Sequence, residues 1–177
     1  GVRTSSCSDI TVDGCSFIGT TDVTTIGKKE KGTKAVAIMG GSNHKILNNY
    51  FGKDLLDGVS IASNSKNNFQ FINNTFEENW YGVFYGGGVR GIVVQGNTFI
   101  NNKVYDLGLV KAAGETKIIN NTFITGNYSV TANGKTIAGT CTPIYIEQGN
   151  TEHGYPSNIE TITIQNNNSI LSRPSCY

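Results

Sequence analysis

The sequence lacks the features that define several other classes of protein. Its 177 residues include no run of about 18 apolar residues, so no membrane-spanning helix is expected. The formal net charge of +1 provides no basic face or stripe, so binding to nucleic acid is not expected either. There are only 3 prolines, 1 methionine and no long amphipathic stretch, whereas Asn, Gly, Thr and Ile are abundant. This composition favours one domain of many short strands joined by turns.

The cysteines do not follow a zinc-binding pattern, and neither a metal nor a cofactor is expected. The four cysteines are Cys7, Cys15, Cys141 and Cys176. No C-x-x-C pair is present, and His44 and His153 lie far from any pair of cysteines. Three pairings are possible, and one of them would join Cys7 to Cys15 within the first repeat. Two interpretations stay open. Either Cys141 forms a disulfide with Cys176 and ties a long C-terminal loop to the chain end, or all four are buried thiols.

What the sequence does contain is a repeat of about 23 residues. One copy is F-Q-F-I-N-N-T-F, at residues 69–76, and the next is I-V-V-Q-G-N-T-F, at residues 92–99. Such a copy predicts a short strand, a tight turn and the start of another strand. Its last position recurs at Phe17, Phe51, Phe76, Phe99, Phe123 and Ser169. The spacings of 34, 25, 23, 24 and 46 predict an insertion after the first copy and one hidden repeat before the last.

A second strand of the form apolar-x-apolar is expected in each period, at residues 36–38, 59–61, 83–85, 107–109 and 144–146. Hairpin strands would recur at about 8–12 residues, and the Leu-x-x-Leu-x-Leu register of leucine-rich repeats is absent. The remaining solution is a chain that coils once per period. Like strands then stack on like strands, about 4.8 Å apart.

The recurring Asn gains a structural role in such a coil. A tight corner needs a positive φ, which Asn tolerates better than other non-glycine residues, and stacked amides can form a hydrogen-bonded ladder. The predicted ladder, with Cys15 in the first place, is Asn49, Asn74, Asn97, Asn121 and Asn167. The phenylalanines at the end of each copy should stack as one interior column.

The repeat I-x-[IV]-x-x-N-x-F, preceded by G-V-x-I, resembles that of the right-handed parallel β-helix superfamily. This superfamily includes pectate-lyase-like enzymes, mannuronan epimerases and phage tailspike depolymerases. The resemblance covers residues 2–170 and is specific for fold rather than activity. We therefore expect an all-β, single-stranded, right-handed parallel β-helix solenoid of about seven coils, with residues 1–177 as a single domain. No cap helix is legible, so we expect a piece of a longer protein or a homo-oligomer, a trimer if tailspike-like.

Three stretches break the period, at residues 19–34, 125–143 and 147–157. Insertions in a solenoid often form its binding side. Val130 is expected in a small strand within the second stretch. The first stretch is basic, because it contains Lys28, Lys29, Lys31 and Lys34. We interpret this charge run as a solvated surface rather than as an anion-binding site.

The strand pattern also predicts which residues share an outer face. In the enzymes that the chain resembles, the substrate groove lies along this face and its loops. Aromatic rings there can pack on sugars while their polar ends bind hydroxyl groups. The residues expected to bind substrate are Trp80, Tyr81, Phe84, Lys103, Tyr105, Tyr145 and Glu147.

Asp57, Glu78 and Asp106 are the candidate catalytic acid and base groups. Equivalent side chains on successive coils should lie about 5 Å apart, and glycosidases need two carboxyl groups at about 5–9.5 Å. Proton abstraction by a lyase would instead use Lys53, Lys103 or Tyr105. Neither the paired calcium-binding Asp residues of lyases nor the Asp-Pro-His-Asp motif of epimerases is legible, which disfavours those two activities.

Simpler interpretations stand beside these roles. Acidic and Lys residues at the turns of a solenoid are often only solvated, and the aromatic residues can be partly core. His44 shares a strand column with Phe69 and Ile92 and is expected to be structural, whereas His153 is expected to be exposed. Three functions remain open: a carbohydrate-active enzyme (tailspike-like, hydrolase or lyase), a glycan-binding or adhesin module, and a structural stalk. Each is expected outside the cell, at a cell surface or on a virion, the first two with a polysaccharide or surface glycan as partner.

Overall fold

The computed structural model describes residues 1–19, 33–61, 67–86, 90–112, 114–132, 135–148 and 161–171. In this part of the chain every regular element is a β-strand. Three parallel sheets contain six strands each. Sheet A consists of β1 (Val2–Ser5), β4 (Lys34–Met39), β7 (Asp57–Ile61), β10 (Tyr81–Gly86), β13 (Tyr105–Ala112) and β18 (Thr142–Gln148). Sheet B consists of β2 (Thr11–Asp13), β5 (His44–Leu47), β8 (Asn67–Ile72), β11 (Arg90–Gln95), β14 (Glu115–Ile119) and β19 (Thr161–Gln165). Sheet C consists of β3 (Ser16–Ile18), β6 (Tyr50–Gly52), β9 (Thr75–Glu77), β12 (Thr98–Ile100), β15 (Thr122–Thr125) and β20 (Asn168–Leu171).

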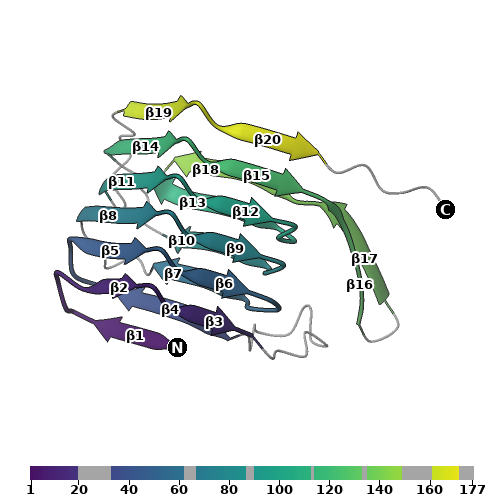
Figure 1. Ribbon diagram of the computed structural model, residues 1–177, viewed down its shortest axis with the longest axis horizontal. Coiled ribbons are helices and arrows are strands. Elements are labelled where there is room, and N and C mark those ends of the chain that lie inside the picture. The colour runs from purple at the N-terminus through teal and green to yellow at the C-terminus, as the bar shows by residue number, and fades with distance from the viewer. Residues whose placement is uncertain are drawn as a thin grey trace.

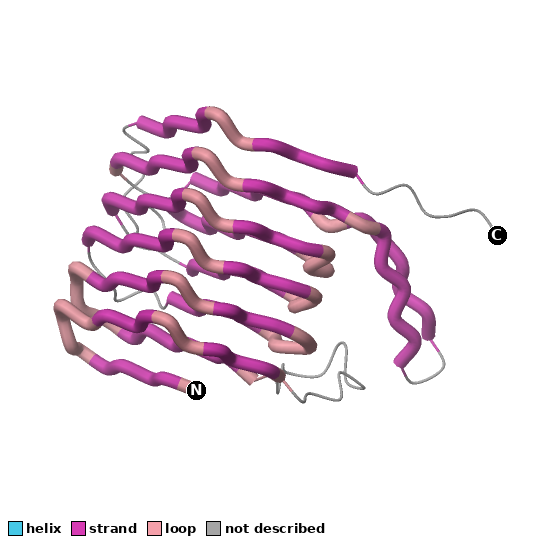
Figure 2. The backbone as a smooth tube through the Cα atoms, in the orientation of Figure 1, coloured by secondary structure: helices cyan, strands magenta, loops and turns pink. Residues whose placement is uncertain are grey.

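Each turn of the chain contributes one strand to sheet A, one to sheet B and one to sheet C, and successive turns stack directly (Figure 1). Short loops join each strand of sheet B to the following strand of sheet C, and the strands of each sheet form parallel rows (Figure 2). The expected all-β parallel helix is confirmed. The expected number of coils is wrong, because the described strands form six coils rather than seven.

The spacing of 46 residues before Ser169 caused this error. β15 pairs directly with β20, with Phe123 opposite Ser169, so the described strands leave no place for a hidden coil between them. Much of the extra length is an antiparallel hairpin of β16 (Asn127–Ala132) and β17 (Lys135–Thr140), which leaves the stack between β15 and β18 (Figure 1). β16 contains Val130, as expected. Lys28, Lys29, Lys31 and His153 lie outside the described residues.

The interior is filled by columns of like side chains. Phe17, Phe51, Phe76, Phe99 and Phe123 stack with ring centroids 4.8–5.2 Å apart and planes within 9° of parallel. This confirms the predicted aromatic column. The strands of sheet B add Ile46, Phe71, Val94 and Ile118, and those of sheet A add Val36, Val59, Val83 and Leu107. Together these columns form one continuous apolar core.

The predicted asparagine ladder is also confirmed. Along Asn49, Asn74, Asn97, Asn121 and Asn167, each Nδ2 donates to the next Oδ1 over 2.9–3.0 Å. The expected positive φ at the ladder residues themselves is wrong. The residue with positive φ is the one before each ladder residue, such as Asn48, Asn73 or Gly96. The ladder residues turn inward and satisfy backbone groups, as when Asn97 Nδ2 donates to Phe71 O over 2.8 Å. Cys15 joins only through its backbone N–H, which donates to Asn49 Oδ1.

Both interpretations of the cysteines are wrong. Cys141 is a buried free thiol rather than part of the expected disulfide, and Cys176 lies outside the described ranges. Cys7 and Cys15 are exposed free thiols. Their Sγ atoms donate to backbone carbonyl oxygens two residues earlier, at Ser5 and Asp13.

Candidate functional site

The outer face of sheet A carries aromatic side chains on three successive strands. Tyr81 of β10 lies opposite Tyr105 of β13. In the next outward column, Phe84 of β10 lies opposite Gly108 of β13, which in turn lies opposite Tyr145 of β18. The residue just before this second column, Val83, Leu107 or Ile144, points into the core, as alternation along a strand requires. Parallel pairing therefore brings together four rings that are up to 64 residues apart in the sequence.

These four rings, named the aromatic row, form a continuous chain of contacts. The centroids of Tyr81 and Phe84 are 4.9 Å apart, and those of Tyr81 and Tyr105 are 5.8 Å apart. Tyr105 stacks on Tyr145 at 4.6 Å, with planes 15° apart. All four side chains are half-buried. Rings that support one another in this way lose little further freedom when a flat ligand packs on them.

Gly108 explains how the rings come so close. A Cβ atom at this position would lie 3.2 Å from Cδ2 of Phe84 and 3.2 Å from Cδ2 of Tyr105. The rings therefore lean over the space that a side chain at position 108 would occupy. The outward column had been predicted from the sequence, but the structural role of its glycine had not.

Polar groups border the aromatic row at both ends. Tyr145 donates its hydroxyl to Glu147 Oε2 over 3.0 Å, and this hydrogen bond, followed by the carboxylate charge, raises the pKa of Tyr145. Toward the N-terminal coils a hollow of about 570 Å³ is lined by Arg3, Lys34 and Ser60, among others. Neither Arg3 nor Lys34 was predicted to belong to a site. Lys34 lies in register with Asp57 and Tyr81, and this regular spacing is the signal that could have indicated it.

Asp57 lies beside the aromatic row but is only 2% exposed. Its Oδ2 is 2.7 Å from Lys34 Nζ, which also donates to Ser60 Oγ over 3.0 Å. The buried carboxylate and the half-exposed ammonium group thus form a pair that fixes both side chains at the edge of the face. In this arrangement Asp57 holds Lys34 in place rather than projecting a carboxylate into solvent.

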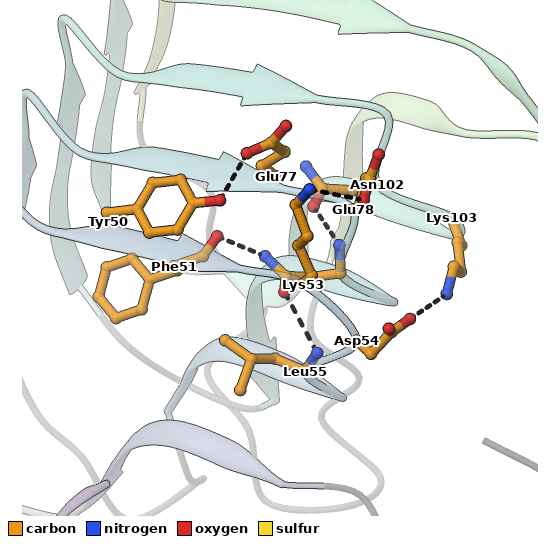
Figure 3. Close-up of polar contacts among 10 residues, drawn as sticks. Tyr50, Phe51, Lys53, Asp54, Leu55, Glu77, Glu78, Asn102 and Lys103 are labelled. Atoms are coloured by element: carbon orange, nitrogen blue, oxygen red, sulfur yellow. Dashed lines mark hydrogen bonds and ion pairs between the residues drawn. The ribbon is translucent and has the colours of Figure 1, made fainter. Parts of the chain in front are cut away.

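Glu78 belongs to a different region, the corner between sheets C and A (Figure 3). It has a positive φ of 55° and is 47% exposed, and its Oε2 is 3.8 Å from Lys53 Nζ. Nearby, Tyr50 donates its hydroxyl to Glu77 Oε2 over 2.5 Å. That hydrogen bond is the largest cause that raises the pKa of Tyr50 to about 12. The exposed ion pair between Glu78 and Lys53, at 3.8 Å, contributes little to stability.

Trp80 and Lys103 also lie at this corner. Trp80 is only 8% exposed, and Lys103 Nζ is 5.4 Å from the centroid of its ring system. The same ammonium group is 3.0 Å from Asp54 Oδ1 (Figure 3). Trp80 therefore presents little surface on which a sugar ring could pack, and Lys103 is engaged by both neighbours. Of the aromatic residues expected to bind substrate, the half-buried ones are the four rings of the aromatic row.

Asp106 lies inside the coil and is 0% exposed. On the two preceding coils the equivalent position is a glycine, Gly58 or Gly82. A Cβ atom at Gly58 would approach the ring of Phe76, and one at Gly82 the ring of Phe99. A second, shorter amide ladder ends on Asp106. Asn79 N donates to Asn102 Oδ1, and Asn102 Nδ2 donates to Asp106 Oδ1 over 2.7 Å.

The surroundings of Asp106 favour its neutral form. Burial raises the pKa of Asp106 to about 7, although the hydrogen bonds from Asn102 and Cys141 act in the opposite direction. Burial, together with the charge of Asp106, raises the pKa of the Cys141 thiol. The structure thus places Asp57 at the start of β7 in sheet A, Glu78 at the corner and Asp106 in the core. It does not bring the three carboxyl groups into one groove.

Other observations complete the description of possible sites. His44 is fully buried, forms a hydrogen bond with Gly40 O over 3.2 Å and packs on Phe69, as expected for a structural residue. Among the described residues, no three His, Cys, Asp or Glu side chains gather as a metal ion would require. The same residues include no helix with the length and apolar character needed to cross a membrane.

Comparison with protein families agrees with the architecture. Residues 1–169 match the family described as the right handed beta helix region. The match covers most of the chain, so this protein belongs to the right-handed β-helix family. No curated protein and no solved structure gave a significant match. The family defines the fold, and the activity has to be argued from the surface of this particular chain.

Proposed function

We propose that the outer face of sheet A binds a polysaccharide or surface glycan, with sugar rings packed on the aromatic row. The observation that carries this proposal is the unbroken contact of Phe84, Tyr81, Tyr105 and Tyr145 across three neighbouring strands. Aromatic faces pack well on the C–H groups of sugars, and tyrosine hydroxyls can form hydrogen bonds at the edge of each ring.

The geometry of the coil suits an extended ligand. Neighbouring strands lie about 4.8 Å apart, so equivalent side chains recur at that interval along the solenoid axis. A chain of sugar rings that follows this axis would meet Tyr81, Tyr105 and Tyr145 in turn and would reach Glu147 at one end. At the other end the hollow beside Arg3 and Lys34 offers two cationic groups to polar substituents.

Binding without turnover is better supported than catalysis. Asp57 is paired with Lys34, Asp106 is enclosed in the core, and Glu78 lies at another corner. The role of these three carboxyl groups as catalytic acid and base stays a prediction. A glycan-binding or adhesin module would act where glycans occur, outside the cell, at a cell surface or on a virion, alone or as a homo-oligomer.

The test is a panel of neutral and acidic polysaccharides, scored for retention and for cleavage with the same protein sample. We expect retention of at least one polysaccharide without new reducing ends or unsaturated products. Tyr105→Ala should weaken that retention at least tenfold, because Tyr105 contacts rings on both sides of it.

Tyr50→Ala is the matched control, since Tyr50 lies half-buried on the outer face of sheet C. It should leave retention unchanged. Equal losses in the two variants, or no retention of any polysaccharide, would contradict the proposal. Cleavage that is lost in Asp57→Asn would instead restore the enzymatic interpretation.

A further inference from the structure

A second concave surface lies on sheet B. Figure 1 shows the strands of this sheet, which are β2, β5, β8, β11, β14 and β19. It has a volume of about 460 Å³ and is lined by residues of five successive coils, from Asp9 to Lys117. Because neighbouring strands lie about 4.8 Å apart, this groove extends roughly 20 Å along the solenoid axis. It lies on a different sheet from the aromatic row and shares no residue with it.

One wall of the groove is an exposed ladder of polar side chains. Asn68 Nδ2 donates to Asn43 Oδ1 over 3.0 Å, and Asn43 Nδ2 donates to Asp9 Oδ1 over 3.1 Å. All three residues have positive φ, between 61° and 63°. This fixes the amides at the corner between sheets A and B, where their remaining donors and acceptors face solvent.

The floor beside this wall is the adjacent outward column of sheet B. It contains Lys45, Gln70 and Val93 in register, one on each coil. The backbone groups of these strands are already paired within sheet B. A ligand in the groove therefore meets side-chain amides, which can both donate and accept, rather than a free strand edge.

Gly91 interrupts this wall. It continues the column of Asn43 and Asn68, but it has no side chain with which to extend the ladder. A Cβ atom at Gly91 would lie 2.8 Å from Asn68 Oδ1. The amide oxygen of Asn68 therefore faces a notch on the fourth coil instead of another amide.

The charges of the groove cancel. Asp9 and Glu115 contribute two carboxylates, whereas Lys45 and Lys117 contribute two ammonium groups. One of each is neutralised locally, because Lys117 Nζ is 2.8 Å from Glu115 Oε1. A polyanion would gain little here, and the groove lacks the basic stripe that nucleic acid requires.

We infer that this groove on sheet B is a binding site for an uncharged, hydroxyl-rich oligosaccharide that lies along the solenoid axis. The amides of Asn43, Asn68 and Gln70 bind successive sugar hydroxyls, and the notch at Gly91 accepts one ring. Val93 provides an apolar contact beside that notch. The site is independent of the aromatic row and would give the protein a second glycan contact on another face.

The test is a titration with cellohexaose, an uncharged hexasaccharide, followed by NMR of the side-chain amides. The NH2 signals of Asn43, Asn68 and Gln70 should shift in the intact protein and equally in Tyr105→Ala. Gly91→Asn should weaken this binding at least fivefold, because Asn tolerates positive φ and would extend the ladder into the notch. Gln70→Ala should also weaken it at least fivefold.

Each variant has a matched control. Gly96→Asn makes the same change at another left-handed glycine that abuts an asparagine oxygen, at Asn73, but outside the groove. Gln95→Ala removes an exposed glutamine from the same strand as Val93. Both controls should bind as the unmodified protein does. No amide shift at millimolar cellohexaose, equal losses in test and control variants, or tighter binding of hexagalacturonate at these same amides would each overturn the inference.

Discussion

Asp106 holds a proton at a pH at which most carboxyl groups are ionised. Its side chain is fully buried, and its pKa rises from 3.8 to about 7 because burial penalises the charged form. Below pH 4 the carboxyl group is protonated in both folded and unfolded chains. Between about pH 4 and pH 7 the folded chain binds the proton more tightly, so the free energy of unfolding should fall as the pH rises through this range.

This linkage gives the first prediction. The free energy of unfolding should fall with a slope that approaches about 1.4 kcal/mol per pH unit between pH 4 and pH 7. Asp106→Asn should flatten the slope, because the amide cannot ionise and its oxygen can still accept from Asn102. Urea unfolding at several pH values measures both. A carbon-13 titration of the Asp106 carboxyl group with a midpoint near 4 would show that the explanation is wrong.

The position of Asp106 also shows where sequence reasoning fails at the residue scale. Alternation correctly placed Leu107 inside, Gly108 outside and Leu109 inside. It fails at residue 106, where the chain turns the corner into sheet A and two consecutive residues, Asp106 and Leu107, are buried. The glycines at the two equivalent positions, Gly58 and Gly82, mark these positions as interior and could have corrected the assignment.

The asparagine ladder is the element that joins the turns between sheets B and C. Asn97 illustrates how densely it is bonded. Its Oδ1 accepts from the N–H of Asn74 over 2.8 Å and from Asn74 Nδ2 over 3.0 Å, and its Nδ2 donates to Phe71 O over 2.8 Å. All of these groups are buried, so none can turn to water when a partner is removed.

The next prediction follows from that bonding. Asn97→Ala should lower the free energy of unfolding by roughly 2–5 kcal/mol, because at least two buried polar groups lose their partners. Asn73→Gly is the control in the preceding turn, where the exposed residue has a φ of 55° that glycine adopts freely. It should cost well under 1 kcal/mol. Denaturant unfolding distinguishes the two, and similar losses would mean that the turn conformation, rather than the ladder, stabilises the corner.

At the scale of the whole molecule, the sequence predicted what repeats and where the repeat is interrupted, but not how many coils the chain forms. The phenylalanine column and the ladder were legible because equal spacing places like side chains over one another. The number of coils was not legible, because the hairpin β16–β17 and residues 149–160 add about one period of length between Phe123 and Ser169. The aromatic row was named residue by residue, but its contacts depend on a glycine whose role alternation does not reveal.

A solenoid of this kind is stabilised by contacts between neighbouring coils, so a defect should cost more in the middle than at an end. Phe99 is 0% exposed and stacks on both Phe76 and Phe123, at 4.9 and 5.0 Å. Phe17 is half-buried and, among the described rings, stacks only on Phe51. Phe99→Ala should therefore lower the free energy of unfolding by about 3–5 kcal/mol, and Phe17→Ala by less than half as much.

Thermal and denaturant unfolding of the two variants measure this difference directly. The six coils share one core, so we also expect Phe99→Ala to unfold in a single transition at a lower temperature. Equal costs for Phe17→Ala and Phe99→Ala would mean that the ends of the stack are as well supported as its centre. That result would locate the stability of the molecule in each coil by itself, and the stacking of one coil on the next would no longer explain why the chain folds.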